Sequence, residues 1–167
     1  EIIVPPVLYG LGLSLALFAA ILLHEMGHAA AALRYGMPVR SITLMILGGV
    51  TEIHQDNATP KETFLVALAG PAVNIALGAI FLIAARVIPS SWTNLMIFCL
   101  LFGGLNLLIA VFNLLPSMPL DGGRMLKSAL SLSMEPGRAA KVTGVVGRTL
   151  ALAGGIYGLM QGQLLLV

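Results

Sequence analysis

Four long apolar stretches dominate the pattern of hydrophobic and polar positions along this chain. They cover approximately residues 6–33, 63–88, 93–115 and 139–160, and each holds about the 20 residues that a helix needs to cross a bilayer. A further apolar helix is indicated from about residue 163 onward. We therefore predict a membrane all-α helical bundle, and we expect residues 1–167 to form a single domain.

The segment between the first two spans has a different pattern. Residues 40–54, RSITLMILGGVTEIH, contain two runs of β-branched and aliphatic residues on either side of Gly48 and Gly49. This pattern predicts a β-hairpin or a paired extended loop, so a small membrane-associated sheet is expected beside the helices. The segment could be an edge strand that binds an unwound substrate, or an amphipathic loop on the bilayer surface.

Composition and charge place the protein in a membrane and give it an orientation. Hydrophobic residues make up 58% of the chain and charged residues 10%, against about 25% in soluble domains. The basic residues form no run, so nucleic-acid binding is not expected. Seven of the nine lie between spans one and two or between spans three and four, which assigns these loops to the cytoplasm: Arg34, Arg40, Lys61, Arg124, Lys127, Arg138 and Lys141.

Two imidazoles and a carboxylate interrupt the first apolar stretch. His24 and His28 are four residues apart, so on a helix both can reach one zinc ion. Glu25 stands beside them, where it can take a proton from an attacking water. Ionisable groups within a membrane span are costly and usually mark a functional site. The H-E-x-x-H spacing therefore predicts a zinc site inside the bilayer thickness.

A catalytic zinc usually has three protein ligands, and the first span offers only two. Asp121 is a candidate third ligand because it flanks the third span on the cytoplasmic side, although read in isolation its position favours capping the short helix that follows. Asn74, in the second span, is either a hydrogen-bonding contact between helices or a polar group directed at the site. Glu52 and His54 are further candidate ligands, for which simple solvation is the alternative.

Four motifs occur in order along the chain. They are His24-Glu25-x-x-His28, Gly48-Gly49-Val50, the AGPxxN motif at residues 69–74, and the NxxPxxPLDGGR motif at residues 113–124. With these motifs the chain resembles the site-2 protease family of intramembrane zinc metalloproteases over roughly residues 7–160. It is most similar to the compact prokaryotic branch that lacks an inserted PDZ domain and often carries C-terminal CBS domains.

The resemblance implies a role for each motif. It implies that one zinc ion is bound by His24, His28 and Asp121, that Glu25 is the general base, and that Asn113 supports the site near the reacting carbonyl. It also implies that the hairpin presents substrate. The expected substrate-binding residues are Gly48, Gly49, Val50, Asn74 and Pro119.

The expected function is that of a multi-pass zinc metalloendopeptidase. It would hydrolyse a peptide bond in or near a transmembrane segment of a membrane protein, in a prokaryotic cell membrane, with the active site toward the cytoplasm. The expected partners are that substrate and the lipid bilayer, with a regulatory partner or a CBS domain outside this chain. Family members usually have another helix before the H-E-x-x-H helix and a complete helix after residue 167, so we expect a trimmed chain.

Two other functions are compatible with parts of the pattern. A catalytically silent membrane scaffold of the same fold would need none of His24, Glu25, His28 and Asp121, yet all four are present. A metal transporter would use the same ligands as a transit site, but it would need polar groups along a path across the bilayer. In this chain the polar groups lie toward one side of the bilayer, which argues against a transport path.

Overall fold

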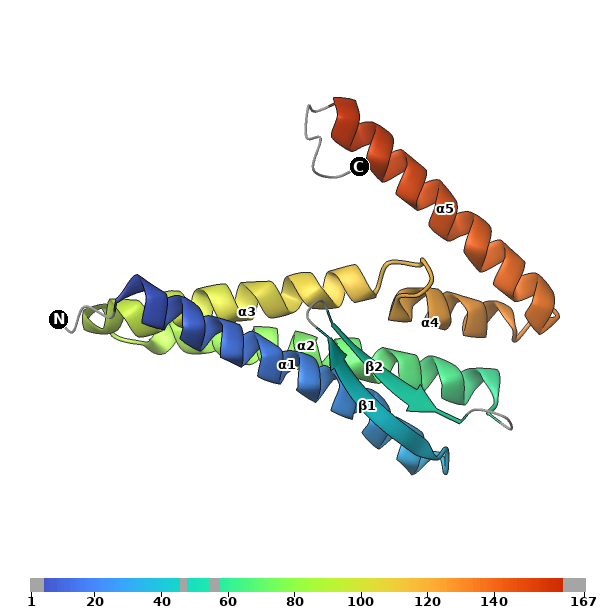
Figure 1. The fold of residues 1–167 in the computed structure, drawn as a ribbon, viewed down its shortest axis with the longest axis horizontal. Coiled ribbons are helices and arrows are strands. Elements are labelled where there is room, and N and C mark those ends of the chain that lie inside the picture. Colours follow the sequence, from blue (N-terminus) through green and yellow to red (C-terminus); the bar gives the residue numbers. More distant parts are fainter. Residues whose placement is uncertain (1–4, 46–47, 55–57, 161–167) are drawn as a thin grey trace.

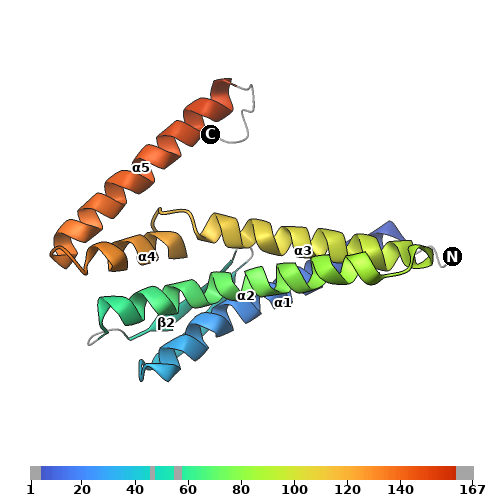
Figure 2. The ribbon, with the colours of Figure 1, turned by 180° about the vertical axis from the view of Figure 1, so that it is seen from behind.

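The computed structural model describes residues 5–45, 48–54 and 58–160, and it contains three long helices that lie side by side (Figure 1). These are α1 (Pro6–Arg34), α2 (Pro60–Val87) and α3 (Thr93–Asn113), with α2 in contact with both others. A single 3-10 turn, η1 (Ser90–Trp92), joins α2 to α3. The short helix α4 (Asp121–Leu130) packs on α2. Helix α5 (Pro136–Met160) packs on α4 and then leads away from the three-helix layer, as the view from behind also shows (Figure 2).

Within the described part of the chain, four helices are long and apolar enough to cross a membrane: Pro6–Arg34, Pro60–Val87, Ser90–Asn113 and Pro136–Met160. They correspond to the four predicted stretches, with ends that differ by a few residues. Most of the large side chains that they expose are apolar, whereas Asn74, Asn106 and Thr143 are fully buried. This distribution suits a lipid environment, in which polar groups must find partners inside the protein. The chain is thus an integral membrane protein with a helical bundle, as predicted; the further helix expected from residue 163 lies outside the described residues.

A Schellman motif ends α1 and directs the chain into the sheet. Gly36 has a φ of 70°, which glycine adopts without a steric penalty. Its N–H donates to the carbonyl of Leu33, and the N–H of Met37 donates to that of Ala32. Met37 then packs with Ala32 and with Val66 of α2, in a cluster that is fully buried. The end of α1 is therefore fixed against α2 just beyond the two histidines.

The predicted hairpin is present, with β1 (Val39–Met45) antiparallel to β2 (Gly48–Ile53). Gly48 and Gly49, however, do not form its turn. They begin β2, where Gly49 pairs with Leu44, and the connection falls at residues 46–47, outside the described residues. Gly49 is required for a different reason: a Cβ at this position would overlap Cγ of Glu25. The sheet therefore lies directly against the carboxylate of α1.

Helix α2 is the central element of the helical layer. A capping box fixes its start, because Thr59 Oγ1 accepts from the N–H of Glu62 and the Glu62 carboxylate accepts from the N–H of Thr59. Its contact with α3 is closest at two glycines. A Cβ on Gly78 would lie 3.1 Å from the carbonyl oxygen of Gly103, and a Cβ on Gly103 would lie equally close to that of Gly78. Small residues thus let the two backbones approach.

A tightly packed turn carries the chain from α3 to α4. The peptide bond between Met118 and Pro119 is cis. Gly122 packs against the carbonyl of Leu114, and a Cβ at Gly123 would lie 2.6 Å from the carbonyl carbon of Ser117. Asp121 is the first residue of α4, and its side chain makes no capping bond, so the capping role considered for it is not observed. These close contacts hold the backbone around Asp121, and its carboxylate points toward His24.

The glycine contact between α2 and α3 yields a stability prediction. Gly103→Ala should lower the free energy of unfolding by about 1–2 kcal/mol, because the added methyl group must displace Leu82 or separate the helices. Gly104→Ala is the matched control, since a Cβ there meets nothing within 4 Å. Thermal unfolding in detergent measures both. Equal melting temperatures for the two variants would contradict the close contact.

Candidate metal centre

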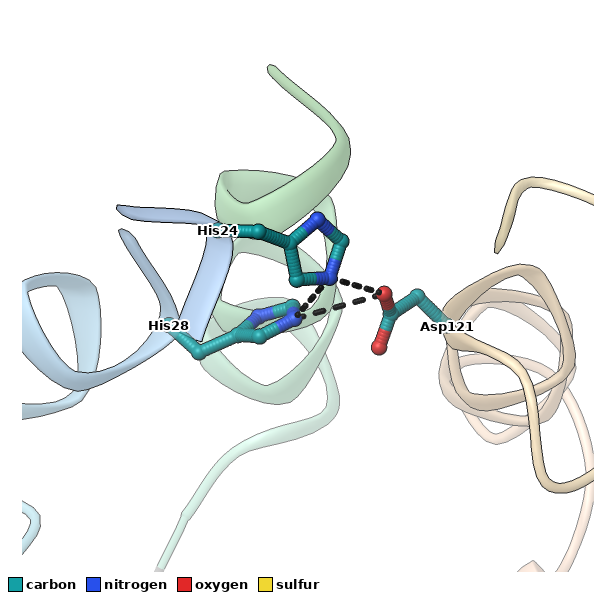
Figure 3. A group of neighbouring side chains, drawn as sticks. All are labelled: His24, His28 and Asp121. Atoms are coloured by element: carbon teal, nitrogen blue, oxygen red, sulfur yellow. Dashed lines mark hydrogen bonds and ion pairs between the residues drawn. The ribbon is translucent and has the colours of Figure 1, made fainter. Parts of the chain in front are cut away.

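Three side chains from two distant parts of the chain converge at one point (Figure 3). His24 and His28 lie one turn apart on α1, and Asp121 reaches them from the start of α4. Asp121 Oδ2 is 3.1 Å from His24 Nε2 and 3.3 Å from His28 Nε2, and the two Nε2 atoms are 3.2 Å apart. All three residues are buried, and they could hold a metal ion.

The far side of each imidazole ring is hydrogen-bonded in a way that fixes its tautomer. His28 Nδ1 lies 2.8 Å from the backbone carbonyl oxygen of Val66, which can only accept, so Nδ1 must carry the hydrogen. His24 Nδ1 lies 2.7 Å from Oδ1 of Asn74. Helix α2 supplies both acceptors. Each neutral ring therefore presents an unprotonated Nε2 to the point of convergence.

The orientation of Asn74 is itself fixed by α3. Asn74 Nδ2 donates to Oδ1 of Asn106 at 3.1 Å, and Asn106 Nδ2 donates to the carbonyl of Phe102 at 2.8 Å. The last acceptor is a backbone carbonyl, which cannot donate. The direction of each hydrogen bond between Phe102, Asn106 and Asn74 is therefore fixed. Both asparagines have no exposed surface. In this buried relay, the carbonyl of Phe102 fixes the orientation of Asn106, which fixes that of Asn74 and so the acceptor that His24 meets.

The geometry and chemistry of the three converging atoms fit a zinc ion. With both Nδ1 atoms protonated, the two Nε2 atoms and Asp121 Oδ2 all offer lone pairs to one another, which is repulsive without a cation between them. Three atoms bound at about 2.1 Å to one tetrahedral ion lie about 3.4 Å apart, close to the separations found here. Two nitrogens and one carboxylate oxygen are also a ligand set that catalytic zinc uses.

Asp121 would bind a metal ion as the deprotonated carboxylate. Gly70 of α2 provides the space around this group, because a Cβ there would overlap Nε2 of His28. Helix α2 thus both orients the two rings and leaves room beside them.

A cavity of about 360 Å³ opens onto the three side chains. Glu25 lines it, and Thr51 of β2 donates a hydrogen bond of 2.5 Å from Oγ1 to Oε2 of Glu25. The same hydroxyl lies 3.3 Å from the carbonyl oxygen of Glu25. Both residues are buried. The hairpin therefore holds the carboxylate in one position at the wall of the cavity.

Nine of the ten site residues that the family resemblance implies line this cavity, and the further candidates Glu52 and His54 do not. Asn113, Gly48, Gly49, Val50 and Pro119 all contribute to its lining, together with His24, Glu25, His28 and Asp121. Asn74, expected among the substrate-binding residues, is fully buried behind His24 and contacts the ring instead of the cavity. His54 lies away from the centre, hydrogen-bonded to Arg40 at 3.3 Å.

Several residues with clear roles in this geometry were not predicted. Thr51, Asn106 and the Val66 carbonyl fix the orientation of functional side chains, and Arg124 lines the cavity. Of these residues, only Asn106 and Arg124 could have been identified from the sequence. Asn106 is an amide inside an apolar span, where polar side chains usually need a buried partner, and Arg124 closes the last motif.

Comparison with known proteins gives matches over nearly the whole chain. The sequence model of Peptidase family M50 matches residues 12–94 and 85–154. A Mycobacterium tuberculosis protein named "Putative zinc metalloprotease Rip3" is 36% identical over 171 residues, covering 95% of this chain and 44% of that protein. Zinc metalloprotease MJ0392 of Methanocaldococcus jannaschii is 34% identical over 158 residues, covering 93% of this chain.

A solved structure is also similar. The site-2 protease from Methanocaldococcus jannaschii superposes with a TM-score of 0.71 at 29% identity, covering 91% of this chain and 69% of that one. The chain spans less than half the length of the two curated relatives, 44% and 45% respectively.

The relay behind His24 yields a prediction about metal affinity. Asn74→Leu should weaken zinc binding by about 10- to 100-fold, because the His24 ring loses the acceptor that fixes its tautomer. Competition with a chromophoric chelator measures the affinity. Thr143→Val is the control, since it removes an equally buried hydroxyl that bonds only within α5. Unchanged affinity in the Asn74 variant would show that the relay does not support the metal.

Proposed function

Since the chain belongs to Peptidase family M50, a family of zinc metalloproteases, we propose that it hydrolyses a peptide bond in or near a transmembrane segment of another membrane protein. One observation carries this proposal: His24 and His28, on a helix of membrane-spanning length, converge with Asp121 of α4 as three lone-pair donors, with Glu25 beside them. Burying ionisable side chains at membrane depth costs free energy. A catalytic role would explain why they are present.

His24, His28 and Asp121 would hold one zinc ion per chain. Bound there, zinc would supply Lewis-acid polarisation of the scissile carbonyl and would lower the pKa of water to about 7. Helices α1, α2 and α4 already hold the three ligands in place, so little rearrangement would be needed on binding.

Glu25 would take the proton of the attacking water and pass it to the leaving amine. Its carboxylate lines the cavity, and the hydroxyl of Thr51 keeps Oε2 in place. Asn113 lines the cavity near the end of α3, where its side-chain amide could donate to the developing oxyanion. Each role belongs to a side chain of the cavity wall.

A substrate helix would have to unwind before cleavage, because its carbonyls are otherwise engaged in backbone hydrogen bonds. Strand β2 can stabilise the unwound form. Gly48, Gly49 and Val50 line the cavity, and β1 pairs with only one edge of β2. An extended substrate segment could add to the other edge by backbone hydrogen bonds. Such pairing would bring the scissile bond close to Glu25, which Gly49 contacts.

The positive-inside rule would orient the chain with this centre toward the cytoplasm. Asp121, Arg124 and Lys127 all lie on α4, between the third and fourth membrane-length helices, with Arg138 and Lys141 at the start of α5. We place the protein in a prokaryotic cell membrane, with a transmembrane protein as its substrate and with lipid around the exposed apolar helix faces.

Two substitutions test the proposed chemistry. Glu25→Gln should abolish cleavage of a transmembrane test substrate, with a loss of about 10²- to 10⁴-fold, while zinc stays bound. Asp121→Ala should lose both zinc and activity. Cleavage in detergent and elemental analysis measure the two properties. A parent chain that binds zinc yet cleaves nothing would favour the silent scaffold, and activity that survives in Asp121→Ala would exclude Asp121 as a ligand.

Thr51 should act on the reaction through Glu25. Thr51→Val should lower kcat about tenfold with little change in KM, because the carboxylate loses the hydrogen bond that holds it. Thr51→Ser keeps the hydroxyl and should retain most of the activity. Steady-state kinetics on both variants separates this role from strand stability, which would lower activity in both. A rise in KM alone for the valine variant would contradict the positioning role.

A further inference from the structure

A second cavity adjoins the metal centre and has no role in the chemistry described above. Its volume is about 620 Å³, and it is formed by β2, the start of α2, and α4. Thr51 and Arg124 line both this cavity and the one at the metal centre. The two cavities therefore adjoin each other, with Thr51 of β2 and Arg124 of α4 between them.

Strand β2 leads from one cavity to the other. Gly48, Gly49 and Val50 line the first, Thr51 lines both, and Ile53 lines the second. From Gly49 to Ile53 the strand advances about 13 Å, at about 3.3 Å per residue. A substrate segment paired with β2 would place its scissile bond near Gly49. Residues two to four positions away would then reach the second cavity.

Among the described residues, the wall of the second cavity carries only positive charge. Arg124 and Lys127 line it, and no acidic residue occurs among the described residues of its wall. Within the described part of the chain, neither side chain forms an ion pair or a side-chain hydrogen bond. Ser128, Ser131 and Thr63 add hydroxyl groups to the wall. Two cations that have no side-chain partner among residues 5–45, 48–54 and 58–160, beside hydroxyl donors, match a carboxylate ligand.

We propose that this cavity is a substrate subsite for an acidic side chain, two to four residues from the scissile bond of a segment bound along β2. The inference rests on the proposed function, and it adds the class of substrate. An aspartate or glutamate in this position would be bound, whereas the lysine and arginine residues that commonly flank membrane spans on the cytoplasmic side would be repelled. Continuity with β2 favours a peptide over a lipid headgroup as the occupant.

Binding of matched peptides tests this subsite without depending on catalysis. Fluorescent peptides would carry Asp, Asn or Lys two to four residues to either side of the intended cleavage site. They would be titrated against the Glu25→Gln chain in a non-ionic detergent. The Asp peptide should bind about two- to fivefold more tightly than the Asn peptide, and the Lys peptide more weakly than either. Adding Lys127→Glu should abolish this order, because Arg124 and the new glutamate leave the described wall without net charge.

Lys141→Glu is the matched control, because it makes the same charge change on an exposed residue of α5 that does not line the cavity. It should preserve the order of the three peptides. Equal Kd values for the peptides, or no binding of any, would overturn the subsite. So would a Lys127→Glu effect that appears only with vesicles containing phosphatidylglycerol and is the same for all peptides, which would assign the cavity to a lipid headgroup.

Failure of the proposed function has a different signature. In that case the chain with Glu25 intact would cleave none of the three peptides, whatever their relative affinities. Cleavage of all three at equal rates and with equal Kd values would leave the protease assignment intact and remove the acidic subsite alone.

Discussion

The metal centre depends on the fact that a backbone carbonyl can accept a hydrogen bond but cannot donate one. The Val66 carbonyl accepts from the His28 ring, and the Phe102 carbonyl sets the direction of the relay through Asn106 and Asn74 to the His24 ring. Both imidazoles are therefore obliged to present bare Nε2 atoms toward Asp121. Three acceptors within 3.3 Å of one another need a cation between them. The tautomers of both histidines are thus determined by helices α2 and α3, which contribute none of the three ligands.

The bilayer explains why this support must be internal. No water is available in the hydrocarbon region to satisfy a misplaced amide or imidazole, so an unpartnered group there costs several kcal/mol. The described residues leave no buried side-chain nitrogen or oxygen without a partner. The same constraint acts on the irregular turn before α4. Gly122 and Gly123 pack this backbone against residues 114–118, which holds Asp121 at the height of the two histidines.

The sequence predicted what local spacing encodes. Apolar length marked the four membrane helices, and the spacing of His24 and His28 placed both on one face of α1. The motif around Asp121 added the third side chain of the centre. The relay behind His24 was not predictable, because it depends on how α2 and α3 rotate against each other. Gly49 was ambiguous in a related way, because a glycine can mark either a turn or a close contact. In the structure it lies in β2, where its close contact with Glu25 leaves no room for a side chain.

Thr51 joins substrate recognition to the chemistry. Its hydroxyl holds the Glu25 carboxylate, and the same residue lies where the two cavities meet on β2. A segment that added to the free edge of β2 would order the strand by backbone hydrogen bonds, and it would do so next to the group that positions the base. Binding along the strand would then bring the scissile bond beside a carboxylate that Thr51 already holds. A peptide that approached the metal centre without pairing to β2 would lack these backbone hydrogen bonds, which would favour cleavage of unwound segments over intact helices.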